Sequence, residues 1–125
     1  MKLDGLDGVA FEGSYLLGWS YDATSVSFDL ELLILHGHPL FRPYNEDEEV
    51  GCFALATLVF PKAEKVSGIE GVKRPEYDEV LGEWRDCREI YGMTNDGDSV
   101  TIETDEDDIV VFAEAGELKY DVVQG

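Results

Sequence analysis

The sequence has few basic residues. Lysine and arginine together number 9, against 28 aspartates and glutamates, for a formal net charge of −19. This shortage of positive charge argues against binding to nucleic acid or to an anionic membrane surface, because both repel an acidic protein. It favours a basic protein as partner, since opposite charges attract before contact. The alternative is an acidic surface that keeps the protein soluble and recognises nothing.

Long apolar runs and paired cysteines are also missing. No apolar run approaches the ~20 residues of a membrane-spanning helix. The N-terminal segment MKLDGLDGVA lacks the apolar centre of a signal peptide. We therefore expect a cytoplasmic protein. Cys52 and Cys87 do not form a C-x-x-C motif, and in a reducing compartment they are expected to be free thiols.

The chain is expected to form one domain, residues 1–125, that folds without disulfides or metal. Its clearest element is residues 24–35, TSVSFDLELLIL, in which apolar and polar residues alternate. This period of two predicts a β-strand with one face in the core and the other in water. The predicted core positions are Val26, Phe28, Leu30, Leu32 and Ile34. At Leu33 and Leu35 the other face also becomes apolar, which predicts that the strand ends under cover.

Short apolar segments between turn residues continue this pattern along the chain. Further strands are expected at residues 14–20, 52–60, 87–93, 99–104, 109–114 and 117–123, and a short edge strand is left open at residues 64–67. Residues 9–11 form either a short strand or a lead-in to the next one. Gly18 predicts a bulge or a close approach of another backbone segment. Tyr15, Leu17 and Trp19 are expected to share one face of their strand.

Two local signals concern the connections. Residues 95–98, NDGD, predict a hairpin with a two-residue type I′ loop at Asp96-Gly97. The apolar residues between 77 and 84 are spaced as on one face of a helix, which leaves a short helix near 75–85 open beside an ordered loop. The whole pattern predicts an all-β fold, either an antiparallel sandwich or a closed barrel of seven to eight strands.

His36 and His38 are spaced as in some metal sites, with acidic residues nearby. A metal site needs three or four converging ligands, and the sequence supplies two obvious ones, so a structural role is the favoured interpretation. The acidic turn at residues 105–108 does not match the spacing of an EF-hand loop. No phosphate-binding loop, nucleophile elbow or zinc-finger spacing is present. We therefore expect neither a metal nor a cofactor, and the sequence favours a protein that is not an enzyme.

Aromatic residues and acidic clusters are better candidates for binding. Aromatic side chains near loops are typical of interfaces and pocket mouths, although protein cores use them too. The candidate pocket or interaction residues are Tyr15, Trp19, His36, His38, Phe41, Arg42, Tyr44 and Trp84. The candidate acidic recognition residues are Glu46, Asp47, Glu48, Glu49, Asp105 and Asp107. The acidic stretch at residues 76–83 is expected on the same face.

Three features carry a resemblance to known proteins: SYLLGWS at residues 14–20, the long strand that follows, and HPLFRP at residues 38–43. With them the chain resembles small bacterial all-β domains that open with the same aromatic hairpin and H-P-aromatic-R-P type of loop. In size and acidity it is similar to some small immunity proteins of bacterial toxin systems. The resemblance implies an all-β domain and assigns no activity, because one fold hosts many functions.

The favoured function is a non-enzymatic acidic module that binds a basic protein partner. The alternative is a small-molecule-binding β-barrel with an aromatic-rimmed pocket near Trp19 and the loop at residues 36–44. A filled core beside an acidic face would favour the first, and a deep apolar cavity would favour the second.

Overall fold

The computed structural model describes residues 1–22, 24–43 and 51–120, and within them the predicted all-β fold is confirmed. The strands are β1 (Lys2–Asp4), β2 (Val9–Tyr21), β3 (Ser25–Ile34), β4 (Cys52–Pro61), β5 (Lys65–Ser67), β6 (Val72–Lys73), β7 (Tyr77–Asp78), β8 (Glu83–Trp84), β9 (Arg88–Asn95), β10 (Ser99–Thr104), β11 (Ile109–Phe112) and β12 (Ala115–Tyr120). No helix in these ranges is long and apolar enough to cross a membrane.

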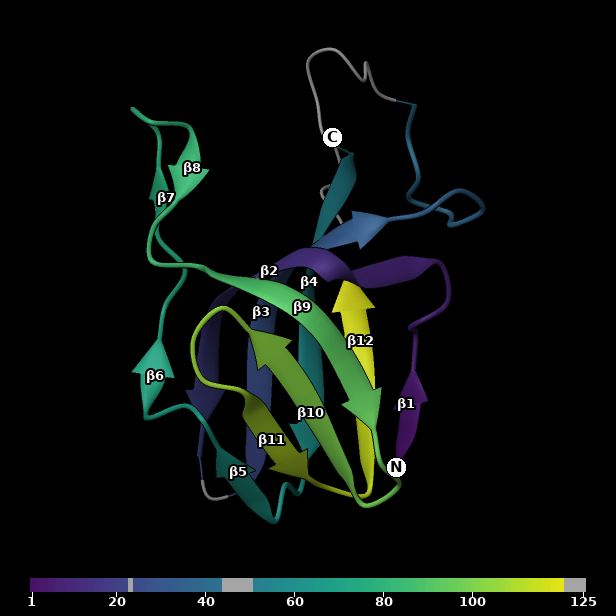
Figure 1. Cartoon of the computed structure of the whole chain (residues 1–125), viewed down its shortest axis with the longest axis vertical. Helices are drawn as coiled ribbons and strands as arrows, with labels where there is room; N and C mark the ends of the chain where they lie inside the picture. The colour runs from purple at the N-terminus through teal and green to yellow at the C-terminus, as the bar shows by residue number, and fades with distance from the viewer. Residues whose placement is uncertain (23, 44–50, 121–125) are drawn as a thin grey trace.

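Ten of the strands form one large mixed sheet with the order β1-β12-β4-β3-β2-β9-β10-β11-β5, in which β6 also pairs with β2. β1 runs parallel to β12, so the expected wholly antiparallel pairing is wrong at this edge. Figure 1 shows β9, β10 and β11 crossing in front of β2, β3 and β4, so that the sheet folds over its core. Among the described strands, β1 and β5 are the two ends of the order and do not pair, so no closed barrel forms.

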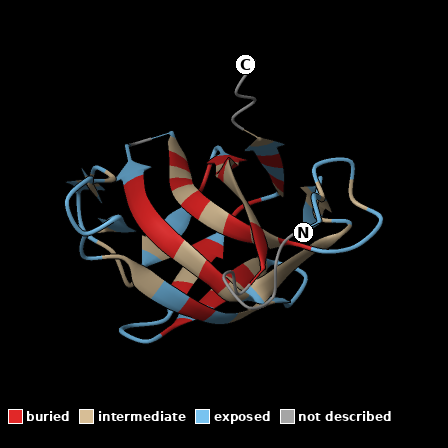
Figure 2. Ribbon diagram, turned by 90° about the horizontal axis from the view of Figure 1, so that it is seen from above, coloured by how far each residue is buried: buried red, intermediate tan, exposed pale blue. Residues whose placement is uncertain are grey.

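The core lies between the two halves of this folded sheet. Buried side chains from both halves form one cluster, which includes Phe28, Phe60, Ile90, Ile102 and Val111. Figure 2 shows the buried residues concentrated along the strands and the exposed ones in loops and at strand ends. These apolar side chains make up the hydrophobic core of the described residues.

β3 confirms the predicted alternation, because all five expected core residues are at most 2% exposed. The strand ends at Ile34, and the next residue, Leu35, is 44% exposed. The expectation that the whole strand end lies under cover is therefore wrong at Leu35. Instead, the Leu35 N–H donates to the carbonyl oxygen of Gly8, which joins the end of β3 to the start of β2.

β2 is one long bent strand, which joins residues 9–11 to the strand expected at residues 14–20. Its pairing with β3 shifts register between Ala10 and Tyr15, and at this bulge the Ser14 hydroxyl donates to the Ala10 carbonyl and accepts from the Leu33 N–H at 2.9 Å. The buried Ser14 side chain thereby replaces ladder hydrogen bonds that the bulge removes.

A second register shift in β2 lies between Leu16 and Gly18. It places Leu16 and Trp19 in the core, so the predicted shared face of Tyr15, Leu17 and Trp19 is wrong. A Cβ on Gly18 would lie 2.3 Å from the carbonyl oxygen of Lys73 in β6. The bulge and the close backbone approach predicted at Gly18 are therefore both confirmed.

Residues 77–84 form a β-hairpin, so the short helix left open near 75–85 is wrong. Asp78 Oδ1 accepts hydrogen bonds from the backbone N–H groups of Val80 and Leu81, each at 3.0 Å, and Gly82 has φ +68°. An aspartate side chain that accepts from backbone N–H groups and a glycine in the left-handed region are both typical of tight turns. The apolar residues spaced as on a helix do not form a face that packs on the core, since Val80 is 93% exposed.

The hairpin between β9 and β10 is confirmed, but its loop is Gly97-Asp98 and so lies one residue beyond the prediction. Asn95 pairs with Val100, and the Asp96 N–H donates to Ser99 O at 2.9 Å. Gly97 has φ +92° at the first loop position, which type II′ loops require. The predicted type I′ loop would need positive φ at both loop residues.

Gly97→Val is expected to lower the free energy of unfolding by about 1–2 kcal/mol, because a side chain disfavours positive φ. A Cβ at this position would meet nothing within 4 Å, so backbone conformation alone causes the loss. Urea denaturation measures it. Gly92→Val is the control, because Gly92 lies in β9 without positive φ and a β-branched residue suits a strand. Equal stability of the two variants would place the turn elsewhere.

At the C-terminal end, Ala115 and Gly116 lie inside β12 and pair with β1. Leu118 is buried, whereas the last residues of the predicted strand 117–123 lie outside the described residues. The edge strand expected at residues 64–67 is confirmed as β5, which ends the strand order beside β11.

Candidate binding pockets

A pocket of about 360 Å³ lies between the β7–β8 hairpin and the sheet. It is lined by Tyr15, Glu31, Tyr77, Gly82, Glu83, Trp84 and Cys87, and we call it the Trp84 pocket. Tyr15 and Glu31 are register partners on β2 and β3, and Tyr77 and Trp84 are partners in the hairpin. The pocket forms where the hairpin covers the polar, non-core face of the central strands. In Figure 1 this hairpin stands clear of the rest of the chain at its far end.

A side-chain hydrogen bond joins the hairpin to the sheet. The Trp84 indole Nε1–H donates to Glu31 Oε2 at 2.9 Å. Tyr77 and Trp84 have ring centroids 5.1 Å apart at an interplanar angle of 62°, the edge-to-face arrangement that aromatic pairs favour. Two aromatic rings at a steep angle and a half-buried carboxylate thus lie around one small cavity.

The turn of the hairpin is held by Asp78. Its carboxylate accepts from two backbone N–H groups and pairs with Arg85 at 2.9 Å. The Leu81 N–H, followed by Arg85, lowers the pKa of Asp78 below its ordinary value. The Asp78 carboxylate is therefore charged at neutral pH. Its hydrogen bonds fix the turn that holds Tyr77 and Trp84 opposite each other.

Cys87 places a thiol in the same pocket. Burial raises the pKa of this thiol, and the negative charges of Glu31 and Asp105 raise it further. Its Sγ donates to the Trp84 carbonyl at 3.8 Å. A thiol held in its neutral form is a poor nucleophile, so this setting does not suit cysteine catalysis. Cys52, the other cysteine, is buried, and both are free as expected.

A second pocket, of about 440 Å³, contains Trp19. The Arg88 guanidinium lies 4.8 Å from the Trp19 ring centroid and donates to the carbonyl oxygens of Gly68 at 3.3 Å and Asp107 at 3.2 Å. Arg88 Nε lies 2.7 Å from a Glu106 carboxylate oxygen. The chain thus supplies its own cation to this tryptophan.

His38 lines a third pocket, of about 330 Å³, with Tyr120. His38 Nδ1 accepts from the Leu40 N–H at 3.0 Å, and Nε2 lies 2.9 Å from the Tyr120 hydroxyl. That hydroxyl donates to Gly5 O at 3.3 Å, and burial raises the pKa of Tyr120. Both ring nitrogens of His38 therefore serve the protein's own hydrogen bonds. In the described ranges, no group of three or more possible metal ligands is present.

The candidate pocket residues separate into these different places. Tyr15 and Trp84 share a pocket, Trp19 and His38 lie in two others, and the His36 ring contacts Phe41 with centroids 4.1 Å apart. Arg42 donates its backbone N–H to Cys52 Sγ at 3.4 Å. Tyr44 lies outside the described residues. The pocket that contains Trp19 is lined by residues of the segment after β5 and by Arg88 and Asp107.

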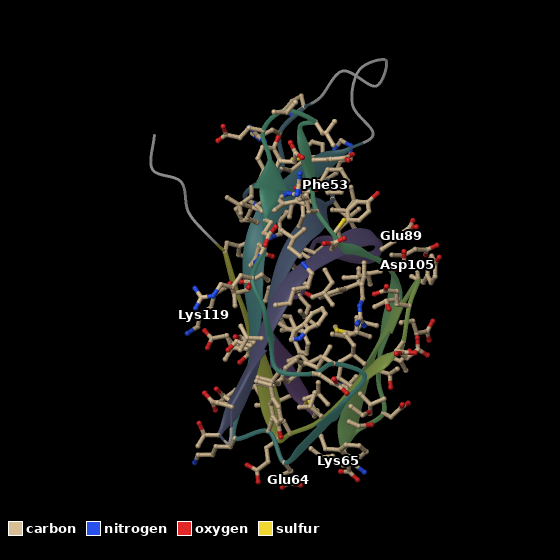
Figure 3. The ribbon with its side chains drawn as sticks, turned by 90° about the vertical axis from the view of Figure 1, so that its left-hand side faces the viewer. Phe53, Glu64, Lys65, Glu89, Asp105 and Lys119 are labelled. Atoms are coloured by element: carbon tan, nitrogen blue, oxygen red, sulfur yellow. The ribbon has the colours of Figure 1, made fainter. Side chains whose placement is uncertain are left out.

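The acidic candidates divide in a similar way. Glu46, Asp47, Glu48 and Glu49 lie outside the described residues. Asp105 is next to Glu89, because its carboxylate accepts from the Glu89 N–H at 3.0 Å, and Asp107 lines the Trp19 pocket. Figure 3 shows Glu89 and Asp105 on one side of the molecule, away from Lys65 at one end and Lys119 on the opposite side.

Glu31 and Cys87 line the Trp84 pocket and were not among the candidate site residues. Glu31 belongs to the polar face of β3, where the alternation predicts plain solvent exposure. Tyr77 is spaced from Trp84 as on a helix, which hid the hairpin. A signal for this site is present in the aspartate and glycine of the segment DEVLG, which suit a tight turn between Tyr77 and Trp84.

In comparisons with known proteins, the chain matched no family model, no curated protein and no solved structure.

Proposed function

We propose that the protein is a cytoplasmic, non-enzymatic binding module that holds a positively charged protein partner against an acidic face. The face consists of Glu76, Asp78, Glu79 and Glu83 in the hairpin, Glu89 in β9, and residues 105–108. The observation that carries the proposal is the hairpin itself. Its residues 76–83 contain four acids and no base, and three of these residues line a pocket that holds another acid, Glu31.

Acids from two segments act on one group beside this face. The pKa of Cys87, between the hairpin and β9, is raised by the negative charges of Glu31 in β3 and of Asp105 in the turn after β10. Arg85 and Arg88 pair with Asp78 and Glu106. The remaining acids have no ion pair within the described ranges, so the face keeps a net negative charge. Such a field speeds the approach of a basic protein.

Reversing charge on this face is expected to slow association with a basic probe. The variant is Glu76→Lys/Glu79→Lys, both exposed and neither in the Trp84 pocket. Stopped-flow mixing with a labelled oligolysine peptide measures the on-rate. For the unchanged protein the on-rate should fall steeply as the Debye length shortens from about 30 Å at 0.01 M salt to about 10 Å at 0.1 M. The double variant should lose most of this salt dependence.

The matched control is Glu114→Lys/Glu117→Lys, which changes the net charge equally. Both residues are exposed, and Glu117 lies on β12 near Lys119. This control should keep most of the on-rate and its salt dependence. If the two double variants slow association equally, total charge and not the face attracts the probe, and the proposed face is wrong.

A further inference from the structure

We propose that the Trp84 pocket binds the guanidinium group of an arginine side chain on the partner. The identity of the partner rests on the proposed function, but the chemistry of the pocket does not. The pocket combines aromatic rings from Tyr15, Tyr77 and Trp84 with the carboxylate of Glu31. Aromatic rings and a carboxylate are the two groups that an arginine side chain engages together.

The Glu31 carboxylate favours a positively charged ligand. Its one hydrogen bond in the described structure comes from the neutral Trp84 indole, and no lysine, arginine or histidine of the described ranges lines the pocket. Lys73 lies close enough for its charge to lower the pKa of the neighbouring Cys87, but its ammonium group donates a hydrogen bond to the Leu17 carbonyl oxygen at 2.7 Å. A half-buried carboxylate against aromatic rings is stabilised when a cation joins it. Only one oxygen of Glu31 is used, so the other can accept from a ligand.

In the pocket that contains Trp19, an arginine of the chain itself occupies the position that we propose for the ligand in the Trp84 pocket. There the Arg88 guanidinium lies over the Trp19 ring at 4.8 Å and beside the Glu106 carboxylate at 2.7 Å. The Trp84 pocket has the tryptophan and the carboxylate, and within the described residues it lacks the arginine. We therefore assign the missing position to an arginine from outside this chain.

Guanidinium suits the pocket better than ammonium. Its flat face can stack on an aromatic ring while its N–H groups donate to a carboxylate in the same plane, whereas an ammonium group has no flat face. The volume of about 360 Å³ is at the lower end of the range for small-ligand sites, which fits one side chain. Tyr77 is 52% exposed, so a side chain on a partner surface can reach the cavity.

The test is a titration of the ¹⁵N-labelled protein with N-acetylarginine amide, followed by NMR of the two indole N–H signals. Trp84 Nε1 donates to Glu31 inside the pocket, whereas Trp19 Nε1 donates to the Glu70 carbonyl at 3.1 Å, so the two signals report on different sites. The Trp84 signal, assigned with Trp84→Phe, should shift and saturate in the millimolar range while the Trp19 signal stays in place. N-acetylcitrulline amide, which has the same shape without charge, should cause no saturable shift.

Glu31→Gln should weaken arginine binding about tenfold, because a charge-assisted hydrogen bond becomes a neutral one. Glutamine retains an oxygen for the Trp84 N–H, so the hairpin stays docked. Glu117→Gln, on β12, removes the same charge elsewhere and should leave binding unchanged. Tyr77→Ala should weaken binding about threefold through loss of a ring.

Several results would overturn the proposal. These are no saturable Trp84 shift, an equal shift with the citrulline compound, equal affinity for N-acetyllysine amide, or unchanged arginine binding by Glu31→Gln. The oligolysine assay fails or succeeds separately, since its variants leave the pocket intact. A pocket that binds arginine in a protein whose face attracts no basic probe would retain this inference and remove the proposed function.

Discussion

Phe28→Ala is expected to lower the free energy of unfolding by about 3–5 kcal/mol, the usual cost of truncating a fully buried phenylalanine. Phe28 lies at the centre of β3, is 0% exposed, and contacts Phe60 of β4 edge-to-face with ring centroids 6.0 Å apart. It also pairs with Trp19 across the β2–β3 ladder. The truncation therefore leaves a cavity between neighbours that backbone pairing holds in place, and these cannot collapse freely into it.

The control for this prediction is Phe112→Ala, which removes the same ring from an exposed position on β11. We expect this control to lose less than about 1 kcal/mol, because surface truncations leave no cavity. Urea denaturation followed by far-ultraviolet circular dichroism measures both variants. Should Phe28→Ala lose no more than the control, the shared core between β3 and the facing half of the sheet would be contradicted.

Gly68→Ala is expected to lower the free energy of unfolding more than Gly97→Ala does. The two glycines have nearly the same backbone conformation, with φ +90° and +92°. A Cβ on Gly97 would meet nothing within 4 Å, whereas one on Gly68 would lie 2.1 Å from the carbonyl oxygen of Asp108. Positive φ should cost each variant about 1–2 kcal/mol. The clash should add about 1–3 kcal/mol to Gly68→Ala alone.

The position of Gly68 explains why the backbone cannot move away. Gly68 follows β5, which pairs with β11 next to Asp108, and its own carbonyl accepts from Arg88. A shift at Gly68 would break this hydrogen bond and loosen Arg88 over Trp19, so Trp19 fluorescence should change with the stability. Chemical denaturation of the two alanine variants gives the difference. Equal stability would mean that the β5–β11 edge is not packed as closely as the structure has it.

The local sequence pattern was sufficient to predict which residues are buried in strands that have one face in the core and the other in water. β3 and β10 confirm this, because alternation requires only that side chains point to opposite sides of a strand. Gly18 was equally informative, since an isolated glycine in a strand usually marks a bulge or a close backbone approach. The excess of acidic residues was also evident from the sequence, but the position of the acidic residues on the surface could not be predicted from it.

The hairpin at residues 77–84 could not be read in the same way. A spacing of seven residues between Tyr77 and Trp84 fits two turns of a helix, and it equally fits two paired hairpin positions. Periodicity cannot separate them over so short a segment, because no core face is involved. The bulge at Leu16–Gly18 was located correctly, yet its effect on Trp19 depended on which residues of β3 it faced.

Local sequence patterns were enough to predict the all-β class, the core face of the central strand, the edge strand β5 and the strong negative charge. The meeting of Tyr15 and Glu31 with Tyr77 and Trp84 in one pocket depends instead on how distant segments pack. Those residues come from three separate segments, and Tyr15 and Glu31 lie on the outer face of the sheet. The alternation in β3 predicts water at Glu31, and the bulge at Leu16–Gly18 turns Tyr15 away from the face that Trp19 occupies. Which part of an outer face becomes covered depends on long-range packing of a hairpin, and no local pattern encodes that contact.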